Sequence, residues 1–472
     1  MNERSTVGML NWTVRGLRSA WNEIAGSVRE AEIGALPPDL PDRDRDRVIG
    51  HMRACLDGRG GEVSSRARAA SLGRAYLSLG PAGRERFLRA MATEFDAPDG
   101  PVDQAITDLR GAADAGARAA ARQSLRRALE PPRRRLLTQF NGLPEGIKFL
   151  VDMRAELLPL ARRDPVLADL DRDLRDLLAA WFDVGFLELR RITWNSPASL
   201  LEKLIAYEAV HEIDGWTDLK NRLDADRRCF AFFHPRMPDE PLIFVEVALT
   251  DGIADNIQAL LDPGAPQVDH HAANTAIFYS ISNTQRGLDG IGFGGFLIKR
   301  VVDELMGELG QLRAFATLSP IPGFRRWLEG WLERDEPEAP ASRRSLRVLG
   351  SDNGHDRPIK EIAELLTARD RLLGEIESFR RPLTRLCARY LAEEKRDDGR
   401  ARDPVAHFHL SNGARIERIN WLSDTSAKGI AQSVGLMVNY QYRPEDIPEN
   451  HEAYVGSGDV PASSVVRTLL RH

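Results

Sequence analysis

The stretch AIFYSISNTQRGLDGIGFGGFLIKR, residues Ala276–Arg300, decides the predicted fold of the second half of the chain. Its first part, Ala276–Ser282, has the apolar and aromatic composition of a strand. A glycine-rich loop follows, and then a helix whose apolar positions recur with helical spacing: Leu297, Ile298, Val301, Val302 and Leu305. Glycines let backbone N–H groups approach a ligand, and a helix N-terminus is electropositive. The stretch therefore predicts a site for a phosphate-bearing ligand.

The predicted phosphate loop comprises seven residues: Asp289, Gly290, Ile291, Gly292, Phe293, Gly294 and Gly295. Three of its glycines match the dinucleotide spacing G-x-G-x-x-G, although one such match is a weak signal. The loop is not a Walker loop, because no Gly-Lys-Ser/Thr follows it. The competing interpretation is a tight strand-to-helix turn that binds nothing.

Composition and charge limit the class of protein. The chain has 472 residues, and its formal charge is 65 − 70 = −5, which argues against a dominant nucleic-acid surface. Hydrophobic residues make up 42% and charged residues 29%, as in globular proteins with sizeable cores. No apolar run approaches the roughly 18 residues of a membrane span. We therefore expect neither nucleic acid nor a membrane as a partner.

Cysteine usage indicates the compartment. Cys55, Cys229 and Cys387 lie too far apart in sequence to form a metal-ligand cluster or a disulfide framework. This pattern is typical of a reducing compartment. The N-terminus shows no secretory signal pattern. The expected location is the cytoplasm.

The character of the chain changes near residue 190. Residues 1–190 have helical spacing and almost no strand pattern, and one apolar stripe is formed by Leu167, Leu170, Leu174, Leu177 and Trp181. This region predicts a helical bundle used for scaffolding or oligomerisation. Its arginines, at 126, 127 and 133–135, form either an anion-binding patch or a solvated helix end and linker. The solvated interpretation is favoured in so acidic a chain.

Residues 191–472 alternate between strands and helices, which makes the overall fold class α+β. Besides Ala276–Ser282, strands are predicted at Cys229–His234, Leu242–Leu249, Arg313–Leu318, Val405–Leu410 and Arg415–Trp421. The last two flank Asn412-Gly413, a strong hairpin signal. A charged, mostly helical insertion is predicted at about 331–403.

Several long motifs in this second half identify a family. They are RITWNSP at Arg191, EPLIFVEVALT at Glu240, LSPIPGFRRWL at Leu318, HFHLSNGARIERINWLSD at His407 and GLMVNYQY at Gly435. Together they resemble the malonyl-CoA decarboxylases. The strand, glycine loop and helix also resemble the coenzyme A pyrophosphate site of the GNAT acetyltransferase fold, whose motif has Gln or Arg where Asp289 stands.

The resemblance implies an architecture and a reaction. Residues 1–190 would form the helical domain and 191–472 an acetyltransferase-like mixed α/β catalytic domain. The protein would form a homo-oligomer, a dimer or tetramer, through the helical domain. It would convert malonyl-CoA to acetyl-CoA and CO2. Because the thioester itself delocalises the electrons left by CO2, neither a metal, biotin nor pyridoxal phosphate is expected.

The resemblance also assigns catalytic residues. It places the catalytic serine at Ser319 and the catalytic histidine at His409, with Asp289–Gly295 binding coenzyme A. Without it, Ser319 would be read as a helix cap and His409 as a structural histidine that shares one strand face with His407. Tyr442 is a further candidate, although core packing explains it equally well.

Two other interpretations remain open at this point. A coenzyme A-dependent acyltransferase of the same fold would transfer the acyl group to an acceptor instead of releasing CO2. A non-catalytic protein would bind acyl-CoA without turnover. The pair His270-His271 is discounted as a metal site, because no acidic or cysteine partner has suitable spacing.

Overall fold

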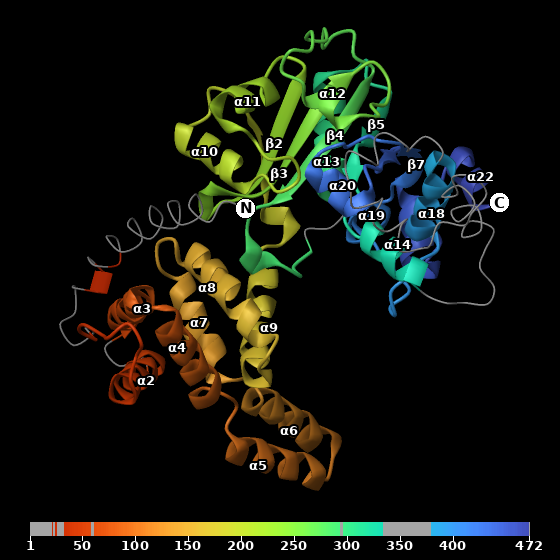
Figure 1. Ribbon diagram of the computed structural model, residues 1–472. Coiled ribbons are helices and arrows are strands. Elements are labelled where there is room, and N and C mark those ends of the chain that lie inside the picture. The colour runs from red at the N-terminus through yellow and green to blue at the C-terminus, as the bar shows by residue number, and fades with distance from the viewer. Residues whose placement is uncertain are drawn as a thin grey trace. The chain divides into compact units, whose positions relative to one another are not determined.

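The computed structural model describes residues 21, 24–25, 33–57, 61–292, 296–333 and 379–471 (Figure 1). The chain divides into two compact units. The first unit comprises residues 1–188, 233–242 and 284–292, and the second comprises 189–232, 243–283 and 293–472. A helical region is followed by a mixed sheet with helices, so the α+β class is confirmed.

The first unit is built mainly from helices. They are α2 (Asp42–Leu56), α3 (Gly61–Ser78), α4 (Pro81–Glu94), α5 (Asp99–Gly111), α6 (Ala115–Ala128), α7 (Pro132–Asn141), α8 (Gly146–Ala161) and α9 (Pro165–Trp181). Three of them, α4, α7 and α9, begin with proline, where the missing N–H costs no hydrogen bond. In Figure 1, α5 and α6 lie side by side as a helical pair.

The predicted stripe lies on α9, but two of its members, Leu177 and Trp181, are only half-buried. The buried residues of α9 are Leu167, Leu170, Leu174 and Leu178. The prediction of a solvated arginine cluster is wrong for Arg133, which is 4% exposed and whose Nε lies 2.6 Å from a carboxylate oxygen of Asp173. A buried guanidinium requires such a partner.

The second unit contains most of an eight-stranded sheet. Its order is β1-β2-β3-β4-β5-β8-β6, and β7 also pairs with β8. The strands are β1 (Glu188–Ile192), β2 (Arg227–His234), β3 (Met237–Thr250), β4 (Thr275–Asn283), β5 (Ala314–Thr317), β6 (Ser319–Pro320), β7 (Arg415–Asn420) and β8 (Met437–Tyr442). β4 and β5 are parallel, and β8 runs antiparallel to β5, β6 and β7.

Helices pack around this sheet. They are α10 (Ala198–Tyr207), α11 (Gly215–Arg222), α12 (Ile257–Leu261), α13 (Phe296–Glu308), α14 (Phe324–Glu333), α18 (Arg380–Ala392), α19 (Pro404–Ser411), α20 (Ala427–Ser433), α21 (Ile447–Glu452) and α22 (Ser464–Leu470). Of the predicted insertion, residues 334–378 lie outside the described part of the chain. The predicted strands match β2, β3, β4, β5 and β7, with one exception.

The exception is Val405–Leu410, which forms helix α19 and not a strand. The Asp403 carboxylate caps this helix by accepting hydrogen bonds from the N–H groups of Val405 (2.9 Å) and Ala406 (3.0 Å). Pro404 occupies the first turn. An Asp-Pro start of this kind favours a helix over the apolar alternation that follows it.

The predicted Asn-Gly hairpin is consequently wrong as well. Gly413 follows the end of α19, and its N–H donates to the carbonyl of Leu410 at 3.0 Å. Its φ of +79° is the left-handed conformation in which helices commonly end. An added Cβ there would lie 2.4 Å from the carbonyl oxygen of Ile447, so only glycine fits.

Candidate active site

Ser319 lies two residues after the end of β5, and together with Pro320 it forms β6. It pairs with Val438 of the antiparallel neighbour β8, and its side chain is buried at 5% exposure. The Ser319 hydroxyl donates to Thr317 Oγ1 at 2.8 Å and lies 3.2 Å from His409 Nε2. The nearest helix, α14, begins only at Phe324, so Ser319 is not its cap. The structure therefore brings together the serine and the histidine that the sequence motifs singled out.

His409 is held on both sides of its ring. Its Nδ1 lies 2.8 Å from the hydroxyl of Tyr442, and its ring stacks on that of Tyr440 with centroids 4.6 Å apart. The side chain is 3% exposed, and this burial lowers the pKa of His409 to about 3. The imidazole is therefore neutral near pH 7 in the protein without ligand.

A neutral imidazole carries one proton, which fixes a consistent direction along the chain of hydrogen bonds. Burial raises the pKa of Tyr442 well above its usual value, so its hydroxyl keeps its proton and donates to His409 Nδ1. Nε2–H then donates to Ser319 Oγ, whose own proton goes to Thr317. Thr317 Oγ1 also accepts from the N–H of Tyr440 at 3.1 Å. This chain of hydrogen bonds from Tyr442 to Thr317 contains no buried charge.

His407 does not share this environment. Because both histidines lie on a helix, two positions apart, they point about 200° apart instead of to one face. His407 Nδ1 lies 2.9 Å from the hydroxyl of Tyr454. The prediction that His407 and His409 share a strand face is therefore wrong.

Asp403 is a residue of this region that sequence reasoning missed. It is fully buried, and besides capping α19 it accepts hydrogen bonds from Tyr390 and from the N–H of Gly323, each at 3.4 Å. Gly323 lies in the Ser319 motif, so one carboxylate ties the serine and histidine segments together. Burial raises the pKa of Asp403. The pair Asp403-Pro404 just before HFHLS could have indicated a helix start with a capping aspartate.

The described residues of the predicted coenzyme A loop, 289–292, belong to the first unit, whereas Ser319 and His409 belong to the second. Asp289, Gly290 and Gly292 are exposed, and Gly290 has a φ of +77°. Phe293, Gly294 and Gly295 lie outside the described residues. The turn η3 (Arg286–Leu288) precedes the loop. Its backbone is used internally, because the N–H of Asp289 donates to Arg286 and that of Ile291 to Leu288.

A second buried polar cluster lies in the sheet unit. The Glu208 carboxylate accepts hydrogen bonds from the hydroxyls of Ser280 (2.7 Å) and Ser282 (3.0 Å) and from the N–H groups of Val210 and His211, each at 2.8 Å. All of its partners are fixed elements of the fold. These hydrogen bonds connect the segment after α10 to strand β4.

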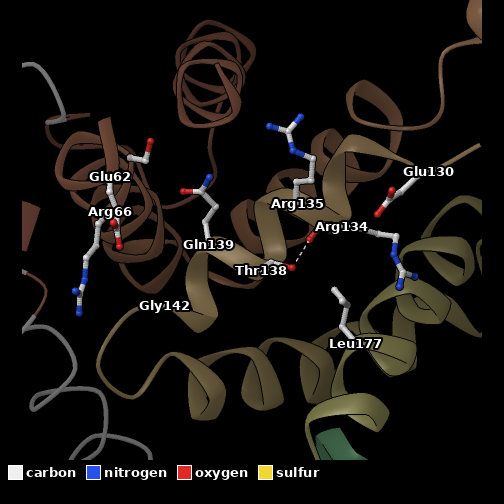
Figure 2. Close-up of a pocket in the computed structure, with 10 residues that line it drawn as sticks. Glu62, Arg66, Glu130, Arg134, Arg135, Thr138, Gln139, Gly142 and Leu177 are labelled. Atoms are coloured by element: carbon white, nitrogen blue, oxygen red, sulfur yellow. Dashed lines mark hydrogen bonds between the residues drawn. The ribbon is translucent and has the colours of Figure 1, made fainter. Parts of the chain in front are cut away.

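A cavity of about 600 Å³ lies among helices of the first unit (Figure 2). Its charged lining has both signs, with Glu62 and Glu130 beside Arg66, Arg134 and Arg135. None of the residues singled out as catalytic or coenzyme A-binding lines it. In the described ranges, no three His, Cys, Asp or Glu side chains gather as metal ligands, and the helices seen there are too short or too polar to cross a bilayer.

Comparison with known proteins decides the family. The model of the malonyl-CoA decarboxylase C-terminal domain matches residues 185–472, and that of the N-terminal domain matches 95–182. The chain belongs to the malonyl-CoA decarboxylase family. It is 40% identical over 419 residues to the mitochondrial malonyl-CoA decarboxylase of Anser anser anser, covering 85% of this chain and 83% of that one. The mitochondrial enzyme of Mus musculus is 39% identical over 406 residues, with 82% of each chain covered.

Solved structures of the family agree with the fold. The malonyl-CoA decarboxylase of Rhodopseudomonas palustris superposes with a TM-score of 0.80 at 42% identity, covering 90% of this chain and 99% of that one. That of Agrobacterium vitis gives the same TM-score and identity, covering 90% and 100%. The family predicted from the motifs is thus confirmed over nearly the whole chain.

Proposed function

We propose that this protein is a carboxy-lyase that converts malonyl-CoA to acetyl-CoA and CO2. The observation that carries the proposal is the buried chain from Tyr442 through His409 to Ser319, in a member of the malonyl-CoA decarboxylase family. A chain of neutral hydrogen-bonding groups can pass a proton without separating charge. The reaction needs such a proton at one step.

The chemistry consists of one bond broken and one bond made. The bond between the carboxylate carbon and the α-carbon breaks, and its electron pair moves into the thioester to give an enolate. The Ser319 hydroxyl donates a hydrogen bond to the oxygen on which the negative charge develops. His409 then supplies a proton to the α-carbon, directly or through Ser319, and acetyl-CoA results. Water restores the proton to the histidine.

The low pKa of His409 fits this role only if the substrate changes it. In the ligand-free protein the imidazole is neutral. The malonyl carboxylate brings a negative charge, which favours the protonated imidazole and raises its pKa. As CO2 leaves, that charge moves to the enolate, which keeps the proton on His409 until the carbon takes it. Tyr442 orients the ring through Nδ1.

The remaining parts of the proposal concern binding and assembly. Asp289–Gly295 bind the pyrophosphate of coenzyme A through backbone N–H groups. No metal, biotin or pyridoxal phosphate takes part, since the thioester accepts the electrons. The helical region at 1–190 forms a homo-oligomer, a dimer or tetramer, and residues 191–472 form an acetyltransferase-like domain. The cytoplasm remains the proposed location, and subcellular fractionation tests it; the buried free thiols of Cys55, Cys229 and Cys387 suit any reducing compartment.

The decisive experiment is an assay without an acceptor. Purified protein is mixed with malonyl-CoA alone, and acetyl-CoA and CO2 are measured. Release of both in equal amounts supports the decarboxylase. Turnover that requires an added amine or thiol would identify an acyltransferase, and binding without turnover would identify an acyl-CoA-binding protein.

A further inference from the structure

Helix α8 of the helical unit holds the backbone of the proposed coenzyme A loop. Arg154, on α8, is 2% exposed and donates from one guanidinium nitrogen to the carbonyls of Gly287 (2.7 Å) and Asp289 (2.9 Å). Its Nε donates to a carboxylate oxygen of Asp171 on α9 at 2.8 Å. All these residues belong to the first unit. A buried arginine thus binds the loop to the helices.

The approach between helix and loop is close. A Cβ added to Gly287 would lie 1.8 Å from the carbonyl oxygen of Val151, so any larger residue would push the loop away from α8. The Asp171 carboxylate is 19% exposed and binds Nε of the guanidinium, while Nη1 binds both loop carbonyls. The contact is therefore built for two specific peptide carbonyls.

Fixing one end of a peptide group fixes the other. The carbonyl of Asp289 and the N–H of Gly290 belong to one planar trans peptide and point in opposite directions. Arg154 binds that carbonyl, so the Gly290 N–H points away from Arg154. Within the part of the chain that the structure describes, no acceptor contacts this N–H. Its neighbours at Asp289 and Ile291 donate within the turn.

Because residue 290 is a glycine, its peptide group needs a partner that fixes its orientation. Gly290 has a φ of +77°, and glycine backbones rotate more freely than any others. Without a partner for the Asp289 carbonyl, the peptide would sample orientations in which the N–H no longer faces a ligand. The charge of a guanidinium also polarises the peptide and makes its N–H a stronger donor.

We infer that Arg154 is a positioning residue for coenzyme A, holding the Asp289–Gly290 peptide so that the Gly290 N–H binds a pyrophosphate oxygen. This rests on the proposed function of the loop. Arg154 itself does not touch the ligand. The helical unit then contributes to substrate affinity and not only to assembly.

The test compares ligands with and without the pyrophosphate. Arg154→Lys keeps the charge but cannot hold both carbonyls together with Asp171. Affinities for coenzyme A and for pantetheine are measured by calorimetry, and kcat and KM for malonyl-CoA and malonyl-pantetheine by product release. We expect Arg154→Lys to weaken coenzyme A binding and raise the KM for malonyl-CoA about tenfold, as for one lost charge-assisted contact. The kcat for malonyl-CoA should stay within about twofold of the wild type. The affinity for pantetheine and the KM for malonyl-pantetheine should also stay within about twofold, since these ligands lack the group that the loop binds.

Arg133→Lys is the matched control. Arg133 is also a buried arginine of the helical unit, paired with Asp173 and donating to the carbonyl of Ala92 at 2.9 Å, but it does not contact the loop. It should lose stability without loss of preference for coenzyme A. Should Arg154→Lys fail to fold, Asp171→Asn removes the carboxylate that orients Arg154 and should give the same selective loss, smaller in size.

The outcomes distinguish the positioning role of Arg154 from the proposed decarboxylation. Equal loss for both ligands, or no loss relative to Arg133→Lys, would overturn the positioning role while leaving decarboxylation intact. A wild-type protein that binds coenzyme A no better than pantetheine would overturn both the loop site and the inference. A protein that prefers coenzyme A and loses this preference in Arg154→Lys, but shows no decarboxylation, would support the inference and refute the proposed reaction.

Discussion

Two buried polar networks of the sheet unit differ in charge. The network around Ser319, His409 and Tyr442 is neutral, because burial lowers the pKa of the histidine to about 3 and raises that of the tyrosine. The other network contains Arg222 and Glu246, which are 2% and 1% exposed and lie 3.2 Å apart. Burial raises the pKa of Glu246 to about 8, and Arg222 opposes that rise.

The two networks differ in whether a hydrogen bond can be given up at low cost. All five donors of Arg222 are used, by Asp218 twice, Glu246, and the carbonyls of His211 and Glu212. Moving any of them would leave a buried charge without a partner, which is costly. In the neutral chain, a hydroxyl can turn from Thr317 to a substrate at the cost of one ordinary hydrogen bond. We infer that the network around Arg222 stabilises the fold, whereas the neutral network around His409 can take part in a reaction.

The largest expected effect is the loss of turnover in His409→Asn. We expect kcat to fall by about 10²- to 10⁴-fold while coenzyme A still binds, since the proton donor is lost. Ser319→Ala should act in the same way, and the double variant should lose much less than the product of the two, because the residues work as one unit. The measurement is kcat and coenzyme A affinity for all four proteins. His407→Asn is the control, and a larger loss there than in His409→Asn would move the role to His407.

Next in size is the stability effect in the charged network. Arg222→Met should lower the free energy of unfolding by about 3–5 kcal/mol, because Asp218, Glu246 and two backbone carbonyls then lose the guanidinium that donates to them. Urea unfolding at pH 7 measures this loss. In the fraction that remains folded, kcat should stay within a few-fold of the wild type. Adding Glu246→Gln to Arg222→Met should recover part of the stability. If Arg222→Met stayed stable but lost turnover, the charged network would serve the reaction and not the stability of the fold.

A smaller effect is expected in the pH dependence of stability. The pKa of His409 is about 3 in the folded protein but about 6.5 in the unfolded chain, so below pH 6.5 only the unfolded chain takes up a proton there. This stabilisation is present above pH 6.5 and is lost as pH falls from 6.5 toward 3. Between pH 7 and 5 the wild type should lose about 2 kcal/mol more than His409→Asn. Equal losses in the two proteins, measured by urea unfolding, would place the folded pKa near its usual value.

The smallest expected effect is that of removing one hydroxyl. Tyr442→Phe takes away the group that donates to His409 Nδ1 and so holds the proton on Nε2. We expect kcat to fall about tenfold, with a stability loss of about 1 kcal/mol. Tyr454→Phe removes the equivalent partner of His407 and should leave kcat unchanged. If both variants behaved alike, the phenol beside His409 would serve packing only.

Much of this protein was predictable from residue types and spacing alone. The strand at Ala276–Ser282 and the apolar face of α13 depend on local periodicity, which burial on one face imposes on the sequence. The same holds for the leucine stripe of α9. Long motifs such as LSPIPGF and INWLSD identified the family, and with it Ser319 and His409 as candidates.

The tertiary structure decided which residues meet. Val405–Leu410 has an alternating pattern that fits a strand, yet the cap at Asp403 and the position of Pro404 make it a helix and turn His407 away from His409. The contacts from Ser319 to His409 and from Arg154 to Asp289 join residues 90 and 135 positions apart. Local propensity acts over a few residues, whereas hydrogen bonds between distant segments depend on how the whole chain packs. That is why the sequence identified the candidate residues, and only the packed fold determined their partners, their burial and their protonation.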